Sequence, residues 1–223
     1  MTREEAGRRI GRVIDEKLMR LDLSRLALNE LPSEIVKCTY LTELYLVRNL
    51  ITSIPEAIGQ LSNLKKLKLN YNKITSIPDA VGQLSNLTWL DFSSNEITSI
   101  PDAVGQLSNL TRLDLNHNQI TSIPDAVGQL SNLTDLDLSN NQITSLPEAL
   151  GQMSNLTWLN LSHNQISSLP GTVRDIEKLE ILDLQGNPTP IPPELLPNKG
   201  FYKEGDVLVL FNQGTQRIIK RFL

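Results

Sequence analysis

Apolar residues recur along the chain with a fixed spacing of 23 residues. The unit 110–132 shows the pattern. Leu110, Leu113 and Leu115 alternate with polar residues, which predicts a short β-strand with one buried face. The apolar positions from 120 to 130 then return the chain to the core on the opposite side. Each unit is therefore a flat coil with an apolar interior.

The nine-residue pattern Leu-x-x-Leu-x-Leu-x-x-Asn begins eight times in phase. The starts are Leu18, Leu41, Leu64, Leu87, Leu110, Leu133, Leu156 and Leu179. Seven units carry the asparagine: Asn49, Asn72, Asn95, Asn118, Asn141, Asn164 and Asn187; the first has Leu26 instead. An amide both donates and accepts hydrogen bonds, so we expect it to satisfy backbone groups of a buried turn. No unit can bury its apolar face alone, which predicts a stacked solenoid.

The segment opposite the strand is almost identical from unit to unit. Ser122-Ile-Pro-Asp125 predicts the start of a short helical turn, with Ser122 as its cap and the proline inside it. Gly128 suits the exit from that turn.

Both ends of the solenoid require caps. Thr2-x-x-Glu5 has the form of a capping box, and apolar residues follow at helical spacing, which predicts an amphipathic helix over 2–16. After Asn187 the repeat is lost in a proline-rich stretch. A last strand is expected over 207–211 and a short helix from Thr215. The predicted domains are a capping helix over 1–17, eight repeats over 18–197 and a C-terminal cap over 198–223.

These units resemble the leucine-rich-repeat family. The resemblance implies an α/β solenoid with a curved parallel sheet on its concave face and short helical turns on its convex face. The form Ile/Leu-Pro-x-x-Ile/Val-Gly-x-Leu is similar to the Ras-related intracellular subgroup, which includes the repeat domains of Roco-type GTPases. The segments 186–196 and 213–223 look like the link from a bacterial Roco repeat domain to its GTPase. The near-identity of the middle units fits recent duplication in a prokaryote, and equally a consensus-designed scaffold.

Two positions beside the buried strand leucines vary between units, although the scaffold is constant. The third position runs Arg20, Glu43, Lys66, Trp89, Arg112, Asp135, Trp158, Ile181. The fifth runs Asp22, Tyr45, Lys68, Asp91, Asp114, Asp137, Asn160, Asp183. Both point outward from the concave sheet, because strand side chains alternate faces. A unit-specific surface on a constant scaffold predicts a binding face; neutral drift at exposed positions is the alternative.

The residue types on this face favour binding, because Trp, Tyr and Arg commonly anchor interfaces. The predicted partner-binding residues are Tyr45, Arg48, Lys66, Lys68, Tyr71, Trp89, Arg112, His117, Asp135 and Trp158. Trp89 and Trp158 could instead lie flat on neighbouring units. Lys and Arg crowd the N-terminal half of the face and Asp the C-terminal half, which suggests a partner of two opposite charges. The stacked carboxylates of Asp91, Asp114 and Asp137 are expected to resist full ionisation.

Composition limits the classes of partner and the cellular compartments that we expect for this chain. The chain has 223 residues and a net charge of -4, which disfavours a nucleic-acid binder. Its longest apolar run, 207–211, is far shorter than the roughly 20 residues of a membrane span. The N-terminus lacks the apolar stretch of a secretory signal. A single cysteine, Cys38, occupies a slot filled by apolar residues in other units, so we expect a core residue in a reducing cytoplasm.

Catalytic chemistry is not indicated. His117 and His163 are the only histidines. They hold the same place two units apart, roughly 10 Å, which is too far for one metal ion. Each repeat has an isolated glycine and no phosphate-binding cluster. The sequence therefore predicts no enzyme, no metal and no cofactor.

Three functions remain open. The first is a non-catalytic module that binds a protein or peptide on its concave face. The second is the regulatory or sensor domain of a larger Roco-type GTPase, with that domain in cis. The third is an engineered consensus-like scaffold without a natural ligand. The sequence identifies neither the ligand nor the oligomeric state, and a homo-oligomer stays open.

Overall fold

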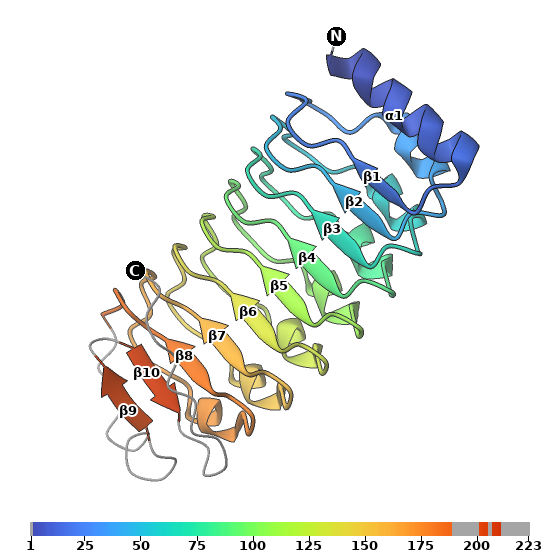
Figure 1. Cartoon of the computed structure of the whole chain (residues 1–223). Helices are drawn as coiled ribbons and strands as arrows, with labels where there is room; N and C mark the ends of the chain where they lie inside the picture. The colour runs from blue at the N-terminus through green and yellow to red at the C-terminus, as the bar shows by residue number, and fades with distance from the viewer. Residues whose placement is uncertain (1, 189–200, 205–206, 211–223) are drawn as a thin grey trace.

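A computed structural model describes residues 2–188, 201–204 and 207–210 of the chain. One sheet runs the length of the molecule in the order β1-β2-β3-β4-β5-β6-β7-β8-β10-β9 (Figure 1). Its strands are β1 Arg20–Asp22, β2 Glu43–Tyr45, β3 Lys66–Lys68, β4 Trp89–Asp91, β5 Arg112–Asp114, β6 Asp135–Asp137, β7 Trp158–Asn160, β8 Ile181–Asp183, β9 Phe201–Glu204 and β10 Val207–Leu210. The predicted solenoid of eight parallel strands is confirmed.

Strands β1–β8 pair in parallel without any shift of register. The central leucine of each strand lies opposite the central leucine of the next, as Leu44 does with Leu67. Every repeat position therefore forms a row across the sheet. We call the outward side chains of β1–β8, with those of the turns that follow them, the strand face.

The core is a continuous column of leucine, isoleucine and valine, with Phe92 in one leucine slot. Cys38 lies in this column, 1% exposed, and burial raises the pKa of its thiol. The prediction of a core cysteine is confirmed. Behind the sheet the units stack so closely that a Cβ atom on Gly128 would lie 2.4 Å from the Ala149 carbonyl oxygen. Glycine is required there by close approach of the backbone.

The predicted helical turns are short 3-10 helices along the side opposite the sheet. They are η1 Ser33–Lys37, η2 Glu56–Gln60, η3 Asp79–Gln83, η4 Asp102–Gln106, η5 Asp125–Gln129, η6 Glu148–Gln152 and η7 Gly171–Asp175. The prediction that Ser122 caps its turn is wrong. Pro124 holds the N-cap position and no side chain caps the turn. A turn that begins directly after an extended proline leaves Ser122 too far upstream to reach it.

The asparagine that recurs in seven units forms hydrogen bonds between its own unit and the one before it. Asn118 Nδ2 donates to the carbonyl oxygens of Phe92 and Leu115, both at 3.0 Å, and its Oδ1 accepts from Ile97 N at 2.9 Å. These bonds confirm that the amide satisfies buried backbone groups. They also explain Leu26, because the first unit has no preceding unit to bond and packs apolar side chains instead.

Helix α1, Thr2–Glu16, covers the first unit and confirms the helical cap (Figure 1). Ala6, Ile10 and Val13 are buried against the core. Glu5 does not bond the helix backbone in the structure; it accepts from the guanidinium groups of Arg8 and Arg9. At the other end, β10 lies within the strand expected over 207–211 and pairs antiparallel with β8. Strand β9, which pairs with β10, was not predicted. The expected helix from Thr215 lies outside the described residues.

Candidate binding surface

Seven of the ten predicted partner-binding residues lie on the strands of the strand face. Lys66, Trp89, Arg112, Asp135 and Trp158 follow one another in register along one row. Tyr45 and Lys68 pair in the neighbouring row. The other three, Arg48, Tyr71 and His117, lie beyond the strand ends, in the turn that follows each strand.

Trp89 lies at the centre of a dense polar cluster. The Lys68 ammonium is 3.2 Å from the centroid of its ring, and the Arg112 guanidinium is 4.8 Å from it. The indole N–H donates to Asp114 at 2.8 Å, and Arg112 donates to the same carboxylate at 2.9 Å. The ring therefore contacts neighbouring units, as the alternative interpretation held. It is still only half-buried, so it remains part of the surface.

In the first three units arginines also lie over aromatic rings, but here those rings are tyrosines. The Arg20 guanidinium lies 4.7 Å from the Tyr45 ring centroid, and that of Arg48 lies 5.0 Å from the Tyr71 ring. Lys66 pairs with Glu43 at 3.0 Å. Burial first, and then its hydrogen bond to Glu43, raises the pKa of Tyr45.

Two of the three stacked carboxylates of β4–β6, Asp91 and Asp137, accept hydrogen bonds from their own turns. Asp91 accepts from the backbone N–H of Ser93, and Asp137 from that of Ser139, both at 3.0 Å. Burial is the main cause that raises the pKa of Asp91 and Asp137, and repulsion from Asp114 adds less. For Asp91 and Asp137 this agrees with the expected resistance to ionisation, but desolvation causes most of it.

A row of left-handed residues borders the strand face, one in each unit. The residue before each asparagine position has positive φ: Arg25 (59°), Arg48 (56°), Tyr71 (59°), Ser94 (55°), His117 (54°), Asn140 (54°), His163 (54°) and Gly186 (71°). Sequence reasoning missed this row. Asn140 and Gly186 were its signal, since these residue types favour that conformation.

Trp158 differs from Trp89. It lies in register between Asp135 and Ile181 and is half-buried. Within the described part of the chain, its indole has neither the stacked cations nor the carboxylate partner that hold Trp89. Trp158 is therefore the less constrained of the two rings.

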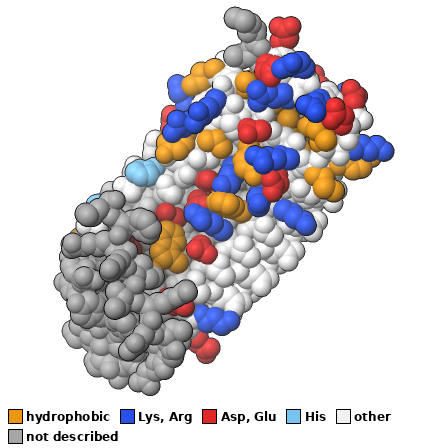
Figure 2. All heavy atoms as spheres, in the orientation of Figure 1, with side chains coloured by type: hydrophobic (Ala, Val, Ile, Leu, Met, Phe, Trp, Pro, Cys, Tyr) orange, Lys and Arg blue, Asp and Glu red, His pale blue; other side chains and the backbone are white. Residues whose placement is uncertain are grey.

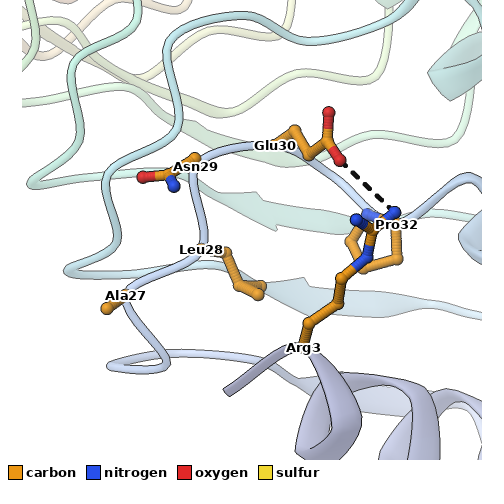
Figure 3. Close-up of a pocket in the computed structure, with 6 residues that line it drawn as sticks. All are labelled: Arg3, Ala27, Leu28, Asn29, Glu30 and Pro32. Carbon is orange, nitrogen blue, oxygen red and sulfur yellow. Dashed lines mark ion pairs between the residues drawn. The ribbon is translucent and has the colours of Figure 1, made fainter. Parts of the chain in front are cut away.

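A separate hollow of about 350 Å³ lies between α1 and the first unit (Figure 3). Arg3 and Glu30 approach to 3.5 Å across it, and Leu28 lies below. Both charged side chains are largely exposed, so water screens the pair. Glu30 is the one carboxylate among its lining residues, and it pairs with Arg3.

The described residues contain no group of three His, Cys, Asp or Glu side chains that could hold a metal ion. None of their helices combines the length and apolar character that a membrane crossing requires.

The family model of the leucine rich repeat matches the chain in six overlapping windows: 16–74, 39–97, 62–120, 85–143, 108–166 and 131–188. Together they cover most of the sequence. No curated protein matches it.

Solved structures also match the chain. A leucine-rich-repeat protein of Leptospira interrogans is 29% identical with a TM-score of 0.69, over 80% of this chain and 52% of that one. The ectodomain of the Arabidopsis thaliana receptor kinase GASSHO1/SCHENGEN3, in complex with CASPARIAN STRIP INTEGRITY FACTOR 2, is 34% identical with a TM-score of 0.71, over 76% and 21%. The plant peptide hormone receptor RGFR1, in complex with RGF2, is 35% identical with a TM-score of 0.66, over 71% and 26%. The chain thus spans about half, or less, of the length of these proteins.

Proposed function

The chain belongs to the leucine-rich repeat family, and on that premise we propose that it is a protein-interaction module whose strand face binds a protein or peptide. The two plant receptors were solved with bound partners, which supports a role in recognition for this fold. The module has no catalytic step of its own. The ten residues predicted from the sequence are proposed as contacts with the partner.

One observation carries this proposal: unit-specific side chains lie in register on a scaffold that hardly changes. The row through Lys66, Trp89, Arg112, Asp135 and Trp158 changes its chemical group at every step, among ammonium, indole, guanidinium and carboxylate. Half-exposed aromatic rings flanked by charged groups have the composition of interface centres.

Site-specific photo-crosslinking tests this function. A photoreactive phenylalanine replaces Trp158 on the strand face or, as the matched control, Gln129 on the exposed opposite side. Adducts formed with one defined partner in the source cells, from position 158 only, support the proposal. Equal adducts from both positions would contradict it.

A second candidate is the regulatory repeat domain of a larger Roco-type GTPase in a bacterial cytoplasm. The resemblance of 186–196 and 213–223 to a Roco linker favours it. The gene sequence beyond codon 223 tests it: an encoded phosphate-binding loop supports this context, and a stop codon contradicts it. In the source cells, a reduced Cys38 thiol would support the cytoplasmic setting.

A further inference from the structure

We propose that the first three units form a receptor for an acidic peptide segment. This inference rests on the proposed function and names the chemistry of the partner. The receptor, here called the basic region, is the part of the strand face from Arg20 to Lys73. Figure 2 shows Lys and Arg side chains gathered over the N-terminal half of the molecule.

Apart from Lys66, the cations of the basic region lack carboxylate partners within the described chain, unlike the arginines of α1 and Arg112. Arg8, Arg9 and Arg12 pair with glutamates of their own helix, and Arg112 pairs with Asp114. Lys66 pairs with Glu43. Within the described chain, the remaining cations of the strand face form no ion pair: Arg20, Arg25, Arg48, Lys65 and Lys68. Their charge is therefore available to a bound partner.

Aromatic rings hold two of these arginines in place. Arg20 lies over Tyr45 and Arg48 over Tyr71. A guanidinium stacked on a ring keeps the N–H donors along its edge free, and those donors match a carboxylate. Because the ring already restricts the side chain, less rotamer entropy is lost on binding.

Backbone conformation indicates which residue can replace Arg25 and Arg48 in a test. Arg25 and Arg48 have φ values of 59° and 56°, in a row where Asn140 and Gly186 hold the same position. A left-handed residue other than glycine or asparagine costs roughly 1 kcal/mol. The repeat imposes this conformation on every unit, and only the first two units have arginine there, so asparagine can replace both arginines without new backbone strain.

The charge of the rest of the strand face selects a short acidic partner. Carboxylates of Asp91, Asp114, Asp135, Asp137 and Asp183 continue the same sheet, and we call this part, from β4 to β8, the acidic region. A long polyanion, such as RNA or an anionic membrane, would extend over them and be repelled. A peptide can end, or change its charge, where the basic region ends.

Fluorescence anisotropy of the full chain with a labelled dodecapeptide of alternating Glu and Ser tests the inference. We expect binding that weakens as salt is raised, because exposed charges are screened. The double variant Arg25→Asn/Arg48→Asn should bind at least tenfold more weakly. Its urea midpoint should equal or exceed that of the parent, since asparagine tolerates the left-handed backbone.

A charge-matched control removes two cations from the last units, Arg174→Asn/Lys178→Asn. Its affinity should stay within twofold of the parent. An equal loss in both variants would overturn the inference, as would tighter binding of a Lys-Ser dodecapeptide, of a uridine 20-mer or of phosphatidylserine vesicles. No binding of the acidic peptide, together with specific crosslinks from position 158, would reject this inference and leave the proposed function intact.

Discussion

The basic and acidic regions share one backbone but use their charged groups in opposite ways. In the basic region, Arg20 and Arg48 rest on aromatic rings and form no ion pair within the described chain. In the acidic region, Asp91 and Asp137 accept hydrogen bonds from their own turns. Apart from Asp114, which pairs with Arg112, the carboxylates of the acidic region form no ion pair within the described chain either. The regions differ in what holds the charged groups: aromatic rings in the first, and the hydrogen-bond donors of its own turns in the second. A partner with two opposite charges stays a prediction, and the proposal for the basic region concerns only the acidic part of that partner.

The largest expected loss of stability tests whether the two regions share one scaffold. Asn49 in the basic region and Asn141 in the acidic region are 6% and 8% exposed and make matching bonds to the neighbouring unit. Replacing either with alanine leaves several buried backbone groups without partners, each worth about 1–3 kcal/mol. We expect both variants to lose about 3 kcal/mol or more in urea unfolding, by equal amounts. A large difference between them would mean that the scaffolds are not equivalent.

An effect of intermediate size should separate the border of the acidic region from its interior. Trp89 at the border contacts Lys68 of the basic region, and Trp158 has no such contact within the described chain. Trp89→Ala removes contacts with Lys68 and Arg112 and the bond to Asp114, so we expect a loss of about 2 kcal/mol. Trp158→Ala should lose about 1 kcal/mol or less. Urea unfolding measures both, and Trp89→Phe, which removes only the indole hydrogen bond, should fall between parent and Trp89→Ala. A costlier Trp158→Ala would reverse the comparison.

The smallest expected change in stability concerns Asp91 and Asp137, whose carboxylates accept hydrogen bonds from their own turns. Burial raises the pKa of Asp137 above its ordinary value of 3.8, so the folded state binds this proton more tightly than the unfolded state does. Stability from this group is then lost as the pH rises from 3.8 through the raised pKa. Asp137→Asn keeps an oxygen for Ser139, as Asn160 does for Ser162, if Asn116 turns its amide.

We therefore expect Asp137→Asn to be more stable than the parent at pH 7, by about 1 kcal/mol or less. The gain should disappear near pH 3, where both states of the parent are protonated. Asp91→Asn provides a second test of the same sign, because burial also raises the pKa of Asp91. Urea midpoints at the two pH values measure this, and a gain that grows on acidification would contradict the assignment.

The sequence predicted the fold well because a period of 23 residues fixes both strand and register. The paired leucines of β1–β8 follow from it directly. It failed at Ser122, because cap signals do not distinguish an α-helical start from a 3-10 turn after proline. It also missed β9, which lies beyond the periodic region.

The candidate surface was predictable in position but not in contacts. Stacking places Trp89 beside Arg112, yet the choice of Asp114 as their shared acceptor depends on rotamers. The left-handed row could have been found by comparing Asn140 and Gly186 with the same position in other units. The difference between paired and unpaired cations required side-chain geometry.

The central claim is that the basic region, and not the acidic region, binds the acidic peptide. The most direct measurement uses the Glu-Ser dodecapeptide with a photo-crosslinker at one end, followed by mass spectrometry of the adducts. We predict adducts within residues 20–73 that disappear in Arg25→Asn/Arg48→Asn. Adducts concentrated within residues 89–183, or on the 3-10 turns, would contradict the claim.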